Sequence, residues 1–293
     1  MMDGLFFILA CFSFALGSAI ASFLNVVIWR VPRGESIVSP PSHCPKCGAP
    51  IRWYQNVPVF AYLALRGRCA SCREPISPRY VLVETLGGLL FLAAYWKFFA
   101  PFLVGRVAPA ELVLPAVNLF VCWIWISLMI VGSMIDFDHQ LLPDFVTVGG
   151  MVLGLVANGF TCLVYWPLIA ARTGLLWREF LLESVGGLVL GFGLMWLIRY
   201  LGSKVFRREA MGLGDVFLMG AVGALFGPSA VLVTLILSSV LGSVAGLAMI
   251  LLAKARLGGF VAIPYGPYIC LGCLGWMFFG RELLNAYLHL MGL

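Results

Sequence analysis

Long uncharged runs separated by short polar segments dominate the chain. The runs cover Gly4–Trp29, 81–103, 112–135, 145–168, 180–198, 215–227, 228–253 and 258–280. About 20 apolar residues cross the roughly 30 Å hydrocarbon core of a bilayer as a helix. The pattern therefore predicts an all-α polytopic membrane protein with about eight transmembrane helices. Because the 38 residues of Val216–Ala253 are too many for one span, we expect a break at Gly227-Pro228.

Composition excludes a soluble protein. Of the 293 residues, 62% are hydrophobic and 11% are charged, and the mean hydropathy is +1.01, which is typical of a membrane protein. The first run lacks the basic start of a secretory signal and is too long for the apolar core of one. We expect a retained first helix over 1–29, a polar domain over 30–80 and a seven-helix membrane domain over 81–293.

Lysine and arginine are unevenly distributed between the loops. With eight spans, 14 of the 19 Lys and Arg residues fall on one side, and eight of these lie between Arg30 and Arg79. Loops rich in Lys and Arg stay in the cytoplasm, so we place the 30–80 domain there. The net charge of +6 then reflects topology and attraction to the anionic lipid bilayer. The basic residues are spread over loops without a recognition motif, so no nucleic-acid partner is expected.

Four cysteines in the 30–80 domain form two Cys-x-x-Cys pairs. Cys44 and Cys47 are separated from Cys69 and Cys72 by 21 residues. Four thiolates with this spacing suit a tetrahedral Zn²⁺ ion. Disulfides are the alternative, but the cytoplasm is reducing. We therefore predict a small zinc-knuckle domain whose metal is structural, because four sulfur ligands leave no open position for catalysis.

Other polar or reactive residues have less specific interpretations. His43 is a spare ligand beside the first cysteine pair. Cys270 and Cys273 repeat the Cys-x-x-Cys spacing, but they lie in an apolar run, and we interpret them as helix-packing residues. Asn25, inside the first run, is expected to hydrogen-bond another helix rather than a substrate. Glu84, inside the second run, is expected to pair with a nearby arginine.

Carboxylates border the apolar runs at two places far apart in the chain. Asp136 ends the run 112–135, and Asp215 opens a later run after a basic loop. Both fall on the predicted cytoplasmic side, and an ionisable residue at the edge of the apolar phase is a functional candidate. Such a pair can activate water with one carboxylate and polarise a carbonyl oxygen with the other. Asp138 and Asp144 are interpreted as solvated helix ends.

Six short motifs follow one another along the chain. They are Ser22–Val26 with Arg30 and Pro32, His43–Gly48 with Cys69 and Cys72, Arg79-Tyr80 with Val83-Glu84, Ile135-Asp136 with Leu142-Pro143-Asp144, Glu209–Asp215, and Ile263–Pro267. Together they resemble the type IV prepilin peptidase family over nearly the whole chain. One motif alone would be a weak signal, whereas all six in this order are highly specific.

The resemblance implies a function and a set of site residues. Members of the family cleave the leader peptides of prepilins and pseudopilins, which build type IV pili and type II secretion machines, at the cytoplasmic face of the bacterial inner membrane. Many members, usually those with four cysteines, also methylate the new N-terminus with S-adenosylmethionine. The catalytic aspartates of the family correspond to Asp136 and Asp215. Supporting positions in the two acid motifs are Pro143, Asp144, Gly212 and Gly214. The two glycines are expected to let main chain pass close to the second acid.

One position departs from the family pattern. Members usually carry a lysine two residues after the second catalytic aspartate, where this chain has Phe217. A lysine would favour ionised carboxylates nearby. Its replacement predicts either a pair that is more easily protonated or a different cation in its place.

Three other functions remain compatible with the sequence. One is a broader intramembrane aspartyl protease that cuts within a helix. Another is an ion- or proton-coupled transporter that uses buried acids as a relay, although the inverted repeat expected of one is not visible. The third is a zinc-stabilised assembly protein with no activity.

Overall fold

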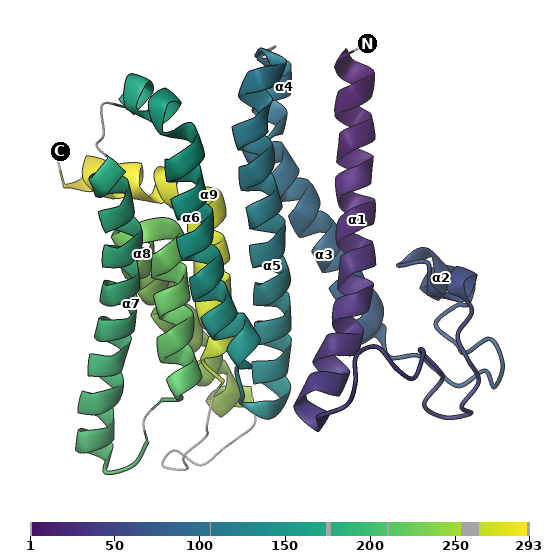
Figure 1. Cartoon of the computed structure of the whole chain (residues 1–293). Helices are drawn as coiled ribbons and strands as arrows, with labels where there is room; N and C mark the ends of the chain where they lie inside the picture. Colours follow the sequence, from purple (N-terminus) through teal and green to yellow (C-terminus); the bar gives the residue numbers. More distant parts are fainter. Residues whose placement is uncertain (1, 106, 174–176, 210, 253–263, 292–293) are drawn as a thin grey trace. The chain divides into compact units, whose positions relative to one another are not determined.

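The structure is a computed structural model, and it describes residues 2–105, 107–173, 177–209, 211–252 and 264–291 (Figure 1). These residues form helices and loops, and the only β pairing among them is two isolated bridges. The chain divides into two compact units, Met1–Val131 and Gly132–Leu293. The all-α architecture predicted from the sequence is confirmed.

The first unit is built on two long helices joined by a polar segment. Its elements are α1 (Met2–Arg30), η1 (Val31–Arg33), η2 (Trp53–Asn56), α2 (Phe60–Ala64), α3 (Pro78–Phe98), α4 (Ala100–Val104), η3 (Pro109–Leu112) and the first part of α5 (Val113–His139). Helices α1 and α3 pack side by side (Figure 1). A Cβ atom on Gly17 would lie 2.6 Å from the carbonyl oxygen of Gly87, so these glycines permit the close crossing.

A hydrogen bond joins the same two helices closer to the polar segment. The side-chain amide of Asn25 in α1 donates to the carbonyl oxygen of Tyr80 in α3 at 3.2 Å. This bond confirms the expected role of Asn25 as a link between helices. It also ties the polar segment 31–77 at both of its ends, because α1 leads into the segment and α3 leads out of it.

The second unit is a helical bundle around α8. Its elements are the end of α5, α6 (Asp144–Thr173), α7 (Trp177–Phe206), α8 (Leu213–Leu252) and α9 (Gly266–Leu290). Helix α8 packs against α6, α7 and α9. Gly187 of α7 and Gly223 of α8 face each other so closely that a Cβ atom on either would clash with the carbonyl oxygen of the other. Glycine therefore sets the spacing of these two helices.

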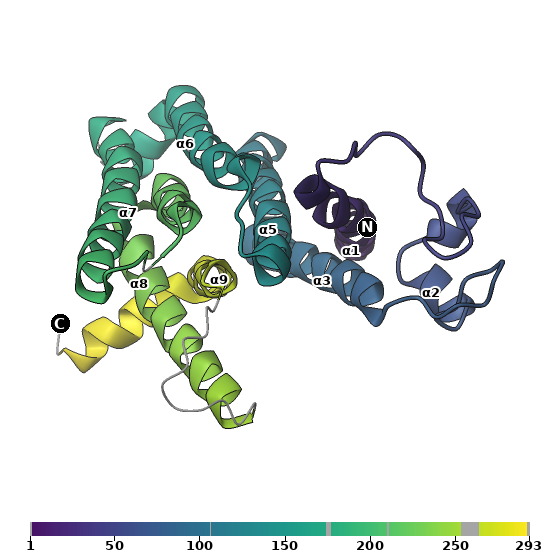
Figure 2. The same cartoon turned by 90° about the horizontal axis from the view of Figure 1, so that it is seen from below.

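Helix α8 is broken where the sequence predicts a break. Gly227 has φ 83° and ψ −178°, which are not helical values, and Pro228 follows it. The two halves run in different directions (Figure 2). An L-residue with a side chain rarely adopts this positive φ, and proline cannot donate the helical hydrogen bond, so the kink follows directly from this dipeptide.

Six helices of the described residues are long and apolar enough to cross a membrane. They cover Gly4–Arg33, Pro78–Phe98, Val113–His139, Asp144–Val164, Leu181–Phe206 and Leu213–Met249. The last of these covers the predicted span 215–227 and the predicted span 228–253 as far as Met249. The eighth predicted span, 258–280, begins outside the described residues, and α9 starts at Gly266. The protein is thus a multi-pass membrane protein, and the total of eight spans stays a prediction.

Candidate active site

Asp136 is buried near the end of α5 and is held by the start of α9. Its side chain is 6% exposed. The main-chain N–H of Gly266 donates a 2.9 Å hydrogen bond to its Oδ2 atom. A Cβ atom on Gly266 would lie 2.7 Å from the same oxygen, which is closer than a side chain can approach. The absence of a side chain at Gly266 therefore lets its main chain reach the carboxylate.

The start of α9 is itself anchored to α8. The hydroxyl of Tyr265 lies within hydrogen-bonding distance of the hydroxyls of Ser238, at 2.8 Å, and Ser239, at 3.3 Å. The carbonyl oxygen of Tyr265 accepts hydrogen bonds from the N–H groups of Tyr268 and Ile269. These bonds fix the residue that precedes Gly266. The motif at 263–267 was visible in the sequence, but its contact with Asp136 was not predicted.

Asp215 is buried in the first turn of α8. Its side chain is 7% exposed, and within the described residues its Oδ1 atom has no hydrogen-bond partner. A buried carboxylate oxygen without a protein partner is rare and is most often explained by function or by water. The first turn of a helix also favours a negative charge. Asp215 is therefore placed like a group that acts on water or a substrate.

The glycines before Asp215 differ in what they allow. A Cβ atom on Gly214 would lie 2.8 Å from Cβ of Leu142, so this position requires a close approach. A Cβ atom on Gly212 would lie 3.6 Å from Oδ2 of Asp215, which is an ordinary contact. The close approach at Gly214 is made by the side chain of Leu142, in the segment after α5, and no crowding explains Gly212.

The structure brings the two acids into one site within the second unit. The side chain of Leu142 contacts the positions of both Gly214 and Gly266, which adjoin Asp215 and hold Asp136 respectively. The Cβ position of Gly266 lies 2.7 Å from Oδ2 of Asp136 and 3.3 Å from Cδ1 of Leu142, and the same leucine lies 2.8 Å from the Cβ position of Gly214, the residue before Asp215. Two segments far apart in the sequence therefore present their carboxylates to the same place, as a paired-acid site requires.

The residues after Asp136 start the next helix. Pro143 is buried, and its carbonyl oxygen accepts hydrogen bonds from the N–H groups of Val146 and Thr147. Asp144 is exposed and is the first residue of α6, where its charge is favourable. Asp138 is also exposed. The interpretation of Asp138 and Asp144 as helix-end acids agrees with these positions.

An arginine holds the loop before the second acid. Arg199 of α7 donates from Nε to the carbonyl oxygen of Met211 at 2.9 Å and pairs through Nη2 with Glu209 at 3.2 Å. Phe217, which stands where the family usually has lysine, packs its ring 5.5 Å from the ring of Phe192 in α7. Position 217 therefore contributes to helix packing, and Arg199 supplies a cation that positions the loop rather than the acids.

The four cysteines of the first unit gather into one cluster. The Sγ atoms of Cys44, Cys47, Cys69 and Cys72 all lie within 4.8 Å of one another, and none of these cysteines is in a disulfide. Thiolates around a tetrahedral zinc ion lie about 3.8 Å apart, and the Sγ atoms of Cys44 and Cys72 are 3.9 Å apart. The cluster could therefore hold a metal ion. His43 is not part of it, since its Nδ1 lies 3.1 Å from the carbonyl oxygen of Pro41.

The two cysteine pairs are built alike. The N–H of Cys44 donates to the carbonyl oxygen of Ala49, and the N–H of Cys69 donates to that of Glu74 in the same way. A β bridge closes each turn, between His43 and Pro50 and between Arg68 and Pro75. Main-chain N–H groups of Cys72 and Ser71 lower the pKa of the Cys69 thiol to about 6. These N–H groups favour the thiolate of Cys69, which is the form that binds metal.

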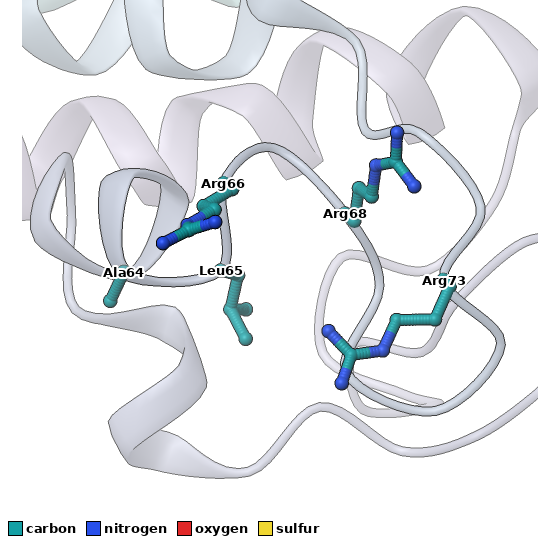
Figure 3. A pocket seen from close by; sticks show the side chains of 5 residues that line it. All are labelled: Ala64, Leu65, Arg66, Arg68 and Arg73. Atoms are coloured by element: carbon teal, nitrogen blue, oxygen red, sulfur yellow. The ribbon is translucent and has the colours of Figure 1, made fainter.

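A hollow beside the second cysteine pair is lined by arginines. Arg66, Arg68 and Arg73 surround a space of about 730 Å³ together with Ala64 and Leu65 (Figure 3). Arg66 and Arg73 have positive φ angles of 52° and 63°. Such angles cost free energy for a residue with a side chain. This basic surface belongs to the polar segment between α1 and α3.

Comparison with known proteins agrees with this geometry. Residues 15–98 match the bacterial peptidase A24 N-terminal domain, and residues 123–247 match the type IV leader peptidase family. The chain is 33% identical over 301 residues to a prepilin leader peptidase/N-methyltransferase of Pseudomonas putida, covering 94% of this chain and 93% of that protein. This chain belongs to the type IV leader peptidase family.

Other members of the leader peptidase family show similar likeness. A prepilin leader peptidase/N-methyltransferase of Myxococcus xanthus is 41% identical over 249 residues, which cover 85% of this chain but 65% of that longer protein. A type 4 prepilin-like proteins leader peptide-processing enzyme of Escherichia coli O78:H11 is 35% identical over 274 residues, covering 87% of this chain and 88% of that protein. No solved structure matches the chain. The resemblance based on sequence motifs is confirmed.

Proposed function

We propose that this leader peptidase family member is an aspartyl endopeptidase that removes leader peptides from type IV prepilins and pseudopilins. The observation that carries the proposal is the buried pair of Asp136 and Asp215, in a chain whose relatives are named for this reaction. We place the reaction at the cytoplasmic face of the bacterial inner membrane, because the basic 30–80 segment marks that side.

Asp136 and Asp215 are the proposed catalytic pair. Two buried carboxylates close together do not both ionise, so they share one proton. The ionised partner takes a proton from water, and the neutral partner donates to the scissile carbonyl oxygen. Gly266 orients the first acid through its main-chain N–H. Pro143, Asp144, Gly212 and Gly214 are the proposed supporting residues of the segments that carry the two acids.

The form of the substrate explains why this chemistry takes place at a membrane. A prepilin joins a basic leader to an apolar helix. If that helix lies in the bilayer among the helices of the 81–293 domain, the junction is presented at the depth of the two acids. Both acids lie at ends of apolar helices, where water can enter from the cytoplasm.

We further propose that the protein methylates the new N-terminus with S-adenosylmethionine, and that a structural Zn²⁺ ion is held by Cys44, Cys47, Cys69 and Cys72 in the 30–80 domain. The first proposal is supported by the relatives named as N-methyltransferases. The second is supported by the mutual distances of the four Sγ atoms. A metal bound by four thiolates stabilises its loop and leaves no open position for a substrate.

The test incubates the purified protein with a prepilin, with and without S-adenosylmethionine, and measures the mass of the product N-terminus. We expect loss of the leader in both cases and one added methyl mass with the methyl donor. Asp136→Asn and Asp215→Asn should each lower cleavage by at least about 10²-fold, because each removes a group that transfers protons. Asp138→Asn, which changes an exposed acid in the same segment, should cleave like the unaltered protein.

Two results would refute the peptidase proposal. Full cleavage by either buried-acid variant would show that the carboxylate pair is not the active site. No cleavage of several prepilins by pure protein would favour the transporter or the inactive assembly protein instead. A cut inside the apolar helix of the substrate would support the broader intramembrane protease.

A further inference from the structure

The first unit contains a cavity that the peptidase chemistry does not use. Its volume is about 860 Å³, and its walls come from the end of α1, the two cysteine turns and the start of α3. Sites for small molecules and cofactors have volumes of about 300–1,000 Å³. The cavity is therefore large enough for a ligand of nucleoside size.

Glu84 is the buried acid of this cavity. It lies in α3, its side chain is 9% exposed, and it lines the cavity wall. The arginine partner expected from the sequence is replaced by a main-chain donor, because the N–H of Val59 donates to Oε2 of Glu84 at 2.8 Å. Within the described residues, Oε1 of Glu84 accepts no hydrogen bond from the protein. One oxygen thus fixes the side chain, and the other is left for a ligand.

The main chain that holds Glu84 is itself strained. Val59 has φ 64° and ψ −53°, which is unusual for a β-branched residue and costs free energy. Its N–H is held toward the carboxylate in this conformation. Strain of this kind persists where the surrounding structure requires it, and it is concentrated at functional sites. The strained main chain of Val59 therefore fixes the orientation of Glu84, and helix packing does not require this arrangement.

The rest of the wall suits a cationic ligand with an aromatic ring. Trp29 and Tyr80 line the cavity, and the ring of Trp29 already holds the guanidinium of Arg33 at 3.7 Å from its centroid. Aromatic faces attract cations and stack on flat rings. Arg30 is buried and donates to the carbonyl oxygens of Ser36 and Pro40, both at 2.8 Å, so it is used in closing the loop.

We propose that this cavity is the methyl-transfer site and that Glu84 is the residue that accepts the proton of the substrate amine. The inference rests on the methyltransferase part of the proposed function. S-adenosylmethionine has an adenine ring and a sulfonium cation, which match the aromatic and acidic parts of the wall. The α-amino group of a protein has a pKa of about 7.7–8.0, so at neutral pH it must lose a proton before it can attack.

The transfer balances with these groups alone. The ammonium of the cleaved pilin donates a proton to Glu84, and the freed lone pair attacks the methyl carbon. The carbon–sulfur bond breaks, and its electron pair remains on sulfur as S-adenosylhomocysteine is formed. The product is a methylated ammonium, and Glu84 returns its proton to solvent.

Glu84→Gln tests this assignment, because glutamine keeps an acceptor for the N–H of Val59 but cannot accept a proton. With prepilin and S-adenosylmethionine at pH 7, we expect normal leader cleavage and methylation lowered by at least about 10²-fold. Methylation by the variant should rise toward the unaltered rate above pH 8, where the amine loses its proton unaided. The matched control, Glu183→Gln, changes an exposed glutamate of the second unit and should methylate normally.

Each other result has a definite meaning. Normal methylation by Glu84→Gln at pH 7, or an equal loss at every pH, overturns the role of Glu84 as proton acceptor. Loss of cleavage together with methylation shows that Glu84 is needed for folding and also overturns the assignment. If the unaltered protein cleaves prepilin but adds no methyl group, the methyltransferase function itself is wrong.

Discussion

At the scale of single residues, Gly266 fixes the orientation of one proposed catalytic acid. Its N–H reaches Asp136 only because it carries no side chain. The hydrogen bond stabilises a charge on that carboxylate and fixes its direction. Gly266 contributes only its main-chain N–H, and such a contribution cannot be recognised from the type of residue. The sequence motifs therefore predicted the two acids but not the group that orients Asp136.

Gly266→Ala should therefore impair cleavage while the protein still inserts. The added Cβ atom would lie 2.7 Å from Oδ2 and 3.1 Å from Cγ of Asp136, so the acid or the helix start must shift. A displacement of about 1 Å at a reacting group can cost about 10²-fold in rate. Initial rates of leader removal measure the effect. Gly193→Ala provides the control, since nothing lies within 4 Å of its Cβ position, and similar rates for both variants would contradict the prediction.

At the scale of elements, the sequence predicted the apolar helices and the paired cysteines, but it did not predict which elements contact one another. The break at Gly227-Pro228 followed from the chemistry of two residues, and the structure has it there. The partner of Glu84 could not be read, because a main-chain N–H in a strained loop has no sequence signal. Helix boundaries follow composition, whereas partners of buried polar groups depend on how the chain folds back.

The cysteine turns should depend on metal for their structure. Segment 31–77 contains only short helices, so bound metal is expected to supply much of its stability. Cys44→Ser should lower bound zinc, measured by elemental analysis, by at least tenfold and should make this segment sensitive to limited proteolysis. Cys11→Ser alters an exposed cysteine outside the cluster and should keep the metal. Full zinc content in Cys44→Ser would contradict a four-thiolate site.

At the scale of the whole molecule, the two proposed activities belong to different compact units. Asp136 and Asp215 lie in the second, and Glu84 with its cavity lies in the first. The boundary between the two units falls inside α5, in an uninterrupted apolar run. Neither charge nor composition could therefore predict this boundary from the sequence. A boundary inside a continuous helix is set by which neighbours each half contacts, and a single sequence does not give these contacts.

If the two sites are separate, a substitution in one site should remove its own activity and leave the other activity intact. Asp215→Asn protein, given a pilin whose leader has already been removed, should still add the methyl group at a rate within about twofold of the unaltered protein. Mass spectrometry of the pilin N-terminus in the presence of S-adenosylmethionine measures this. A variant that methylates the pre-cut pilin poorly, while still binding the methyl donor, would mean that the two reactions share a group.

The hydrogen bond between Gly266 and Asp136 joins residues 130 positions apart, and this has a consequence for biosynthesis. At about 5–20 residues per second, a ribosome adds Gly266 on the order of ten seconds after Asp136. During that time the first acid has been made but lacks the N–H that orients it. A nascent chain thus carries its protease site in an unfinished form, and we expect hydrolysis to begin only when nearly all of the bundle has been translated and inserted.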